Sequence, residues 1–216
     1  MSRYYAAERE PVASTFRNFS IYSSAPPVAG GAQLAAFLNN YEQYGSPKLY
    51  SEDAGSANAL MSAWLLAPST RNRIADPGLW ATTTEPFTNK DTARTRWRCF
   101  NANKAPTSDL FRGDTLVCDK AANDDDSRLS TSLGLESDQP EHLHAQGTTA
   151  FTVADADGNI VAVTQTLGTW GGNFYVSPGL GFIYNDKLGS YGTDPGSYGA
   201  RLPFARHGST IAPTIA

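Results

Sequence analysis

The sequence has no hydrophobic run long enough to cross a membrane, and its basic residues form no cluster. Its 17 lysines and arginines are interspersed among 21 aspartates and glutamates, giving a formal net charge of −4. Nucleic acid and anionic membranes attract clustered basic residues, so neither is an expected partner. With 40% hydrophobic residues among 216, the composition predicts a soluble globular protein with one sizeable core.

The sequence also lacks a recognisable secretory signal at its start and has few cysteines. The first residues, MSRYYAAERE, lack the apolar segment of a secretory signal, so either the protein is cytosolic or the chain does not begin at the natural N-terminus. Cysteine occurs only as Cys99 and Cys118. With no histidine or further cysteine at ligand spacing they are not expected to bind zinc, and a disulfide or two buried free thiols remain equal alternatives.

Residues 16 to 68 predict one strand and two helices. Apolar residues alternate around Phe19 and Ile21, and this strand should end at the Pro-Pro and Gly-Gly loop of residues 26 to 31. Large apolar side chains then recur at helical spacing within 31 to 45 and within 53 to 67, before Pro68. We expect them to face the core: Leu34, Phe37, Leu38 and Tyr41 in the first helix, and Ala57, Leu60, Met61, Trp64 and Leu65 in the second.

Residues 81 to 145 are polar and irregular in composition, which is typical of an exposed connection. Three consecutive carboxylates, at 124 to 126, are interpreted as solvated rather than as a metal site. His142 and His144 are interpreted as surface residues, because no third ligand accompanies them. The sequence therefore predicts neither a metal nor a cofactor.

A β-hairpin is predicted to start at Thr148. The strand TTAFTVA is followed by the turn DADGN and by the strand IVAVTQTL. If the loop centres on Asp157, the numbers of paired residues sum to 314, and Thr148 lies opposite Thr166. A two-residue loop would instead place the two threonines on opposite faces, and the separation of small hydroxyl residues from large apolar ones favours the first register. Both faces carry apolar residues, so we expect both to be buried.

Thr148 itself has two interpretations. It could simply begin a strand, as threonine often does. Alternatively, the chain could cleave its own Gly147–Thr148 bond, leaving Thr148 with a free α-amino group beside its hydroxyl. Such an amine has a pKa of about 8 and can accept the hydroxyl proton, which makes the threonine a competent nucleophile for acyl transfer. Glycine before the bond would permit a strained backbone.

Several motifs resemble the γ-glutamyltransferase family, in order along nearly the whole chain outside about 85 to 140. TTAFTVADADGNIVAVTQTLGTWGG, PGLGFIYNDKL and RHGSTIAPTIA are similar to the start of the family's small subunit. YYAAEREPV, IYSSAPPVAGG and IADPGLW are similar to the last third of its large subunit. The resemblance implies an α+β fold of the N-terminal-nucleophile hydrolase type, a four-layer αββα sandwich. It also implies a large-subunit segment at 1–147 and a small-subunit segment at 148–216.

The resemblance also assigns site residues. Thr148 would be the nucleophile and the new N-terminus after cleavage at Gly147, and Thr166 would hydrogen-bond to it. Ser209 matches the first of two serines that bind the substrate α-carboxylate, and Thr210 takes the place of the second.

Three positions depart from the family pattern. Gly168 replaces an asparagine, while Lys187 and Ser190 replace the Gln and Asp that bind the substrate α-ammonium group. A lysine would repel that group. Asp186 could substitute if the backbone shifts by one residue, and otherwise the acyl group need not be glutamyl.

The resemblance leaves three functions open. The first is transfer of a γ-glutamyl group from glutathione or a γ-glutamyl amide to water or an amino acid, by a pair of subunits formed on cleavage. The second is an amide hydrolase or acylase with another acyl group, and the third is a relative that is never cleaved. The substrate-clamping arginine and the Gly-Gly pair of the oxyanion hole fall outside this sequence, so we expect the chain alone to be inactive. Family members are commonly periplasmic or extracellular.

Overall fold

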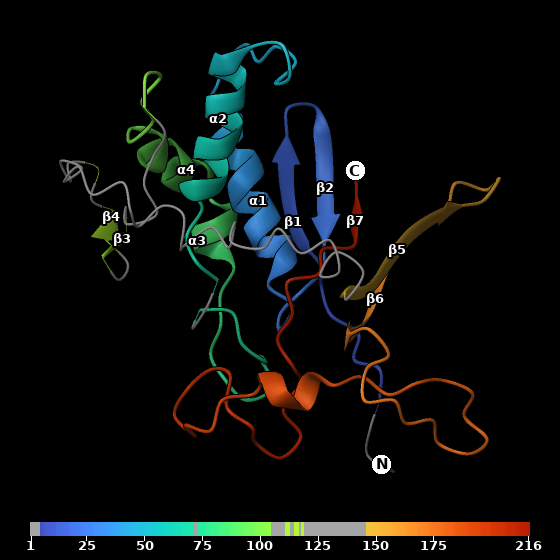
Figure 1. Cartoon of the computed structure of the whole chain (residues 1–216). Coiled ribbons are helices and arrows are strands. Elements are labelled where there is room, and N and C mark those ends of the chain that lie inside the picture. The colour runs from blue at the N-terminus through green and yellow to red at the C-terminus, as the bar shows by residue number, and fades with distance from the viewer. Residues whose placement is uncertain (1–4, 71–72, 105–110, 113–114, 117, 119–145) are drawn as a thin grey trace, which may run out of the picture. The chain divides into compact units, whose positions relative to one another are not determined.

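The computed structural model describes residues 5–70, 73–104, 111–112, 115–116, 118 and 146–216 (Figure 1). These residues form two compact units, one of residues 1–116 with 192–216 and the other of residues 117–191. The first unit combines a small sheet with helices, and the second is built on a long hairpin.

The sheet of the first unit has three antiparallel strands in the order β1 (Val12–Phe16), β2 (Phe19–Ser23) and β7 (Thr214–Ile215). The predicted strand around Phe19 and Ile21 is confirmed as β2, and it ends before Pro26. Helix α1 (Gly30–Tyr41) packs against β1. Ser14 Oγ donates to Asn39 Oδ1 at 3.3 Å, and the Phe16 ring stacks on Tyr41, which fixes the helix on the sheet.

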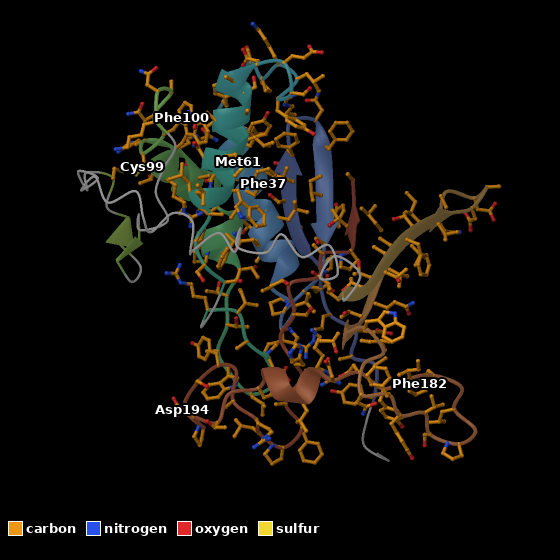
Figure 2. All side chains as sticks on the ribbon, viewed as in Figure 1. Phe37, Met61, Cys99, Phe100, Phe182 and Asp194 are labelled. Atoms are coloured by element: carbon orange, nitrogen blue, oxygen red, sulfur yellow. The ribbon has the colours of Figure 1, made fainter. Side chains whose placement is uncertain are left out.

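Both predicted helices exist, as α1 and as α2 (Ala54–Leu65). Asp53 caps α2, because its side chain accepts the Ser56 backbone N–H. The prediction that the large apolar side chains face the core is wrong for Met61, which is 54% exposed (Figure 2), and for Trp64, which is 52% exposed. The other predicted residues of both helices are half-buried. The buried residues are small or carry amides: Gly30, Gly31, Ala32, Ala35, Ala36, Asn39 and Asn40 in α1, and Ser56, Ala59, Ser62 and Ala63 in α2.

Close approach of the two helices explains which residues are buried. The Asn40 side-chain amide donates to the Ala63 carbonyl at 3.0 Å, a contact that requires short side chains between the two backbones. The larger side chains lie beside this contact instead. Phe37 of α1 meets Trp64 of α2 edge to face, with ring centroids 5.8 Å apart. The stripes therefore mark the margin of the interface rather than its centre.

The expectation of an irregular segment from 81 to 145 is wrong for its first part. Helices α3 (Glu85–Thr88) and α4 (Lys90–Trp97) lie there, followed by the short paired strands β3 (Phe111–Arg112) and β4 (Thr115–Leu116). Residues 124–126, 142 and 144 lie outside the described part of the chain.

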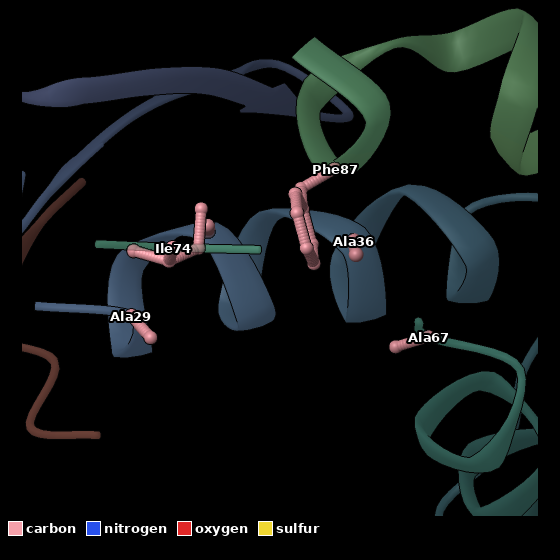
Figure 3. Packing of buried hydrophobic residues seen from close by; sticks show 6 residues of the cluster. Ala29, Ala36, Ala67, Ile74 and Phe87 are labelled. Carbon is pink, nitrogen blue, oxygen red and sulfur yellow. The ribbon is translucent and has the colours of Figure 1, made fainter. Parts of the chain in front are cut away.

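Capping and one aromatic side chain give these two short helices their order. The Asn89 side chain caps α4 by accepting the N–H groups of Asp91 and Thr92 at 2.8 and 2.9 Å. In α3, Phe87 is 1% exposed and lies in a hydrophobic cluster with residues of α1 and the neighbouring segments (Figure 3). Those residues are Ala29, Ala32, Ala36, Ala67 and Ile74. Neither a cap nor a single buried ring produces a hydrophobic period in the sequence.

Cys99 and Cys118 are both disulfide-bonded, which selects the first of the two alternatives for the thiols. Within the described residues, no helix combines the length and the apolar character needed to span a bilayer.

The second unit contains the hairpin of β5 (Gln146–Ala154) and β6 (Ile160–Thr169), and the short 3-10 helix η3 (Lys187–Ser190). The predicted register is confirmed, because Thr148 pairs with Thr166 and Ala154 pairs with Ile160. In the turn, the Asp155 carboxylate accepts the backbone N–H groups of Asp157 and Asn159 at 3.0 and 2.9 Å. Gly158 adopts a φ of +87°, which favours glycine.

The prediction that both faces of the hairpin are buried is wrong. Phe151, Val153, Ile160 and Val161 are between 45% and 56% exposed. The hairpin forms a two-stranded sheet, and no third described strand pairs with it. Alternating apolar residues indicate which side chains favour burial, but a covering layer has to come from elsewhere in the fold.

Candidate active site

The hydroxyl groups of Thr148 and Thr166 meet across the hairpin. The two residues are direct cross-strand partners, and Thr148 Oγ1 donates to Thr166 Oγ1 at 3.0 Å. Thr148 is exposed and Thr166 is half-buried. The turn and the ladder together set this contact, because a shift of one residue would move Thr166 to the other face.

A β-bulge lies directly beside the two threonines. Gln146 pairs with Thr169 whereas Thr148 pairs with Thr166, so Gly147 alone faces Leu167 and Gly168. The bulge turns the backbone so that the Gly168 N–H donates to Thr166 Oγ1 at 3.0 Å. The Thr166 oxygen therefore accepts one hydrogen bond from the backbone and one from Thr148. The Gly147–Thr148 peptide bond lies at the irregular point of the ladder.

Asp186 is hydrogen-bonded to Thr169, which lies at the edge of the same bulge. Its Oδ2 accepts the Thr169 hydroxyl at 2.5 Å, and its two oxygens lie 3.3 and 3.4 Å from the Thr169 backbone nitrogen. The Asp186 N–H donates in turn to the Leu167 carbonyl at 2.9 Å, which joins the loop before η3 to β6. Because the Thr169 hydroxyl and backbone N–H both donate to the carboxylate, the pKa of Asp186 lies below its usual range, and the group is charged at neutral pH.

Gly168 leaves room for this carboxylate. A Cβ atom at position 168 would lie 1.7 Å from Asp186 Oδ1, and the glycine has a φ of +98°. Position 168 therefore excludes any side chain while Asp186 keeps its place. The departure at Gly168 and the presence of Asp186 are physically coupled, which the sequence did not indicate.

The other expected residues of this unit lie nearby along the chain. Lys187 begins η3, and its backbone N–H donates to Asn185 Oδ1 at 3.0 Å. Ser190 ends the same short helix. Sequence reasoning missed Thr169, the donor to Asp186. Its only signal was a hydroxyl residue directly after Gly168, which is too common a pattern to single out.

Ser209 and Thr210 belong to the first unit. The Ser209 carbonyl accepts the Ala29 N–H at 2.6 Å, and Ser209 forms a parallel bridge with Val28. The Ser209 hydroxyl accepts the Ile211 N–H at 3.3 Å, while Thr210 is exposed. The backbone of this hydroxyl pair is thus held by the loop that precedes α1.

The chain is similar in sequence to curated proteins of two enzyme classes, glutathione hydrolases and acylases. The chain is 29% identical over 225 residues to the glutathione hydrolase proenzyme of Escherichia coli (strain K12), covering 100% of this chain and 35% of that protein. It is also 29% identical over 223 residues to the acylase ACY 1 proenzyme of Pseudomonas sp. (strain V22), covering 100% of this chain and 34% of that protein. The chain thus spans about a third of the length of these curated relatives.

A solved structure shows the same mixed α and β fold. The crystal structure of cephalosporin acylase from Bacillus halodurans matches 95% of this chain and 31% of its own, with a TM-score of 0.62 and 17% identity. The family model described as Gamma-glutamyltranspeptidase matches residues 1–216, which is the whole sequence. The chain therefore belongs to the gamma-glutamyltranspeptidase family.

Proposed function

We propose that Thr148 is the nucleophile of an acyl-transfer enzyme and becomes an N-terminus when the Gly147–Thr148 bond is cleaved. The hydrogen bond of 3.0 Å between the Thr148 and Thr166 hydroxyls is the observation that carries this proposal. It orients the Thr148 oxygen beside the bulge where the peptide bond would be cut. Curated relatives bear the name proenzyme, which fits a precursor that is processed.

The chemistry follows from the freed amine. With a pKa of about 8, a useful fraction of the Thr148 α-amine is neutral at physiological pH and takes the hydroxyl proton. The Thr148 oxygen then bonds to the carbonyl carbon of an amide substrate, and the carbon–nitrogen bond breaks as the leaving amine receives the proton. Water or an amino acid attacks the carbonyl carbon of the resulting ester and receives the acyl group, the bond to the Thr148 oxygen breaks, and the proton lost by the attacking group returns to that oxygen.

The substrate we favour is a γ-glutamyl amide such as glutathione. Ser209 and Thr210 would bind its α-carboxylate, and Asp186 would bind its α-ammonium group. Asp186 suits that role because it is ionised and because Thr169 occupies only part of its accepting capacity. The name of the Escherichia coli relative, glutathione hydrolase, supports the same substrate.

A second candidate is an acylase that accepts an acyl group without an ammonium. Lys187 follows Asp186 directly and would repel an ammonium group, and the ACY 1 relative has the same 29% identity to the chain as the glutathione hydrolase of Escherichia coli. An uncleaved relative without activity is the third candidate.

The proposal extends to the complete protein. We expect an αββα sandwich in which the two cleavage products remain paired, acting on small molecules without a metal or cofactor. A periplasmic or extracellular location is consistent with the disulfide-bonded cysteines, because disulfides persist in oxidising compartments.

Cleavage is tested first, by intact-mass spectrometry and N-terminal sequencing of the protein at its full natural length. We expect a product that begins Thr-Thr-Ala-Phe in the unaltered protein. Thr148→Ala should remain a single chain, whereas Thr148→Ser should still be cut because it keeps a hydroxyl. An unaltered protein that stays uncut after long incubation would support the inactive relative and remove the enzyme proposal.

Substrate choice is tested next with the cleaved enzyme. Hydrolysis of a γ-glutamyl anilide is compared with that of a glutaryl anilide, which lacks the α-ammonium group. The transferase proposal predicts a clear preference for the γ-glutamyl compound, and Asp186→Asn should reduce that preference. A preference for the glutaryl compound would favour the acylase.

A further inference from the structure

Asp76 is a buried carboxylate in the first unit, far along the sequence from the residues assigned to the site. It is 5% exposed and has donors on both oxygens. Oδ1 accepts the Gly78 N–H at 3.0 Å and Arg9 Nη2 at 3.1 Å, and Oδ2 accepts the Arg206 backbone N–H at 2.8 Å. Burial of a carboxylate is costly unless it is well partnered, and donors from three segments offset that cost here.

The contact with Arg206 matters because Ser209 lies only three residues further along the chain. The Arg206 side chain has contacts of its own. Arg206 Nη2 donates to the Tyr5 carbonyl at 3.0 Å, and the guanidinium lies 4.6 Å from the centroid of the Tyr5 ring. Asp76 and Tyr5 together fix where this segment begins.

The far end of the same segment is held by the loop before α1. Ala29 N–H donates to the Ser209 carbonyl at 2.6 Å, and Ser24 Oγ donates to the Ile211 carbonyl at 3.1 Å. The packing is close, since a Cβ atom at Gly30 would lie 2.2 Å from the Ile211 carbonyl oxygen. Residues 206 to 211 are therefore anchored at both ends, and a short span has little slack between its anchors.

We propose that Asp76 is a positioning residue that sets the placement of Ser209 and Thr210 by holding the backbone at Arg206. The inference rests on the proposed function, in which those two hydroxyl residues bind the substrate carboxylate. Asp76 acts through the backbone and does not touch the substrate. Its loss should therefore weaken substrate binding while leaving the chemistry at Thr148 in place.

The test uses the full-length cleaved enzyme and a γ-glutamyl anilide. In Asp76→Asn the remaining oxygen should lie at Oδ1, where two donors converge, and the amide group should replace Oδ2, where it cannot accept the Arg206 N–H. We expect KM to rise about tenfold while kcat per cleaved chain changes less than about twofold. Arg9→Met is the matched control, because it removes the ion pair at Oδ1 and leaves the Arg206 contact at Oδ2; its KM should stay within about twofold of the unaltered enzyme.

A purely structural role would give a different result. Asp76→Asn would then lower the melting temperature and the cleaved fraction while KM stayed constant, and the proposal would be overturned. If this variant does not accumulate as folded protein, Asp76→Glu keeps the charge but displaces both oxygens, and the same rise in KM is expected. A constant KM in Asp76→Glu would also overturn the proposal.

Ser209→Ala separates this inference from the function on which it rests. A raised KM in Ser209→Ala with a constant KM in Asp76→Asn overturns the positioning role alone. A constant KM in Ser209→Ala overturns the assignment of the carboxylate site, and the positioning role falls with it.

Discussion

The helix pair α1–α2 and the hairpin β5–β6 are held together in different ways. The helices bury small side chains at close approach, and their order depends on the cluster around Phe87. The hairpin leaves its large apolar side chains exposed, and its geometry is set by a hydrogen-bonded turn and a ladder with one bulge. The first region is defined by packing between distant segments, whereas the second is defined by local hydrogen bonds.

This difference bears on function because the proposed nucleophile lies in the hairpin. A threonine pair needs a fixed register more than it needs a deep core, and the turn supplies that register locally. Ser209 and Thr210 depend instead on contacts between distant segments, because Asp76 and the loop before α1 hold their backbone. Substitutions in the core should therefore affect mainly Ser209 and Thr210, and substitutions in the turn should affect mainly Thr148 and Thr166.

The largest expected effect is the loss of a core ring. Phe87→Ala removes a side chain that is 1% exposed, and we expect it to lower the free energy of unfolding by about 3–5 kcal/mol. Phe151→Ala is the matched variant in the hairpin, where the ring is 49% exposed, and it should cost less than about 1 kcal/mol. Urea unfolding of the full-length protein measures both values. Equal losses would show that the hairpin is as well covered as the helices.

The second effect concerns the bulge. Gly168→Ala would place a Cβ atom 1.7 Å from Asp186 Oδ1, so either the carboxylate or the Gly168 N–H must move away from its partner. We expect cleavage at Gly147 to slow by about a hundredfold, because small displacements of reacting groups have large effects on rate. The rate is followed by the appearance of the Thr-Thr-Ala-Phe product.

Gly158→Ala provides the control for Gly168→Ala. Gly158 has a similar φ of +87°, but nothing lies within 4 Å of the position that a Cβ atom would take there, so the substitution adds strain without a clash. Its cleavage rate should stay within a few fold of the unaltered protein. Combining Gly168→Ala with Asp186→Ala removes the clash and should restore much of the rate. Equal rates in the two single glycine variants would show that a clash with Asp186 does not disturb the hydrogen bond from Gly168 to Thr166.

The elements of the fold could be predicted where a local pattern specifies them. The strand at Ile21, the two helices and the register that pairs Thr148 with Thr166 follow from apolar spacing and turn residues. Burial could not be predicted in the same way. Met61 and Trp64 are exposed because α1 packs against the face of α2 that carries small side chains. Which face is packed depends on the surface shapes of both helices.

The candidate site shows the same limit. The threonine pair could be predicted from the turn and the alternation, and family resemblance added Ser209 and Asp186. The hydrogen bond from Thr169 to Asp186 and the space left by Gly168 join residues that are 17 and 18 positions apart across an irregular loop. Asp76 lies in the segment IADPGLW, which carries part of the family resemblance, but its contact with Arg206 spans 130 positions and has no local signature.

The smallest effect is a pH dependence confined to the turn. Asn159 donates through its side-chain amide to Asp155 at 2.7 Å and through its backbone at 2.9 Å, and these bonds lower the pKa of Asp155. Because the folded pKa lies below the unfolded value of about 3.9, the stabilisation is present above that value and is lost as pH falls through the folded pKa. The turn should therefore loosen only below about pH 4.

Amide hydrogen exchange between pH 3 and 6, corrected for the intrinsic pH dependence of exchange, measures this loosening. The N–H groups of Asp157 and Asn159 donate to Asp155, so their protection should fall at the acid end, while amides of α1 keep theirs. Asp155→Asn has no carboxylate to titrate at this position and should show weaker protection that does not change with pH. If the unaltered protein and Asp155→Asn gave parallel profiles, another group would control the turn. The contrast between the two regions would then lose its local electrostatic basis, because the Asp155 carboxylate would not control the turn.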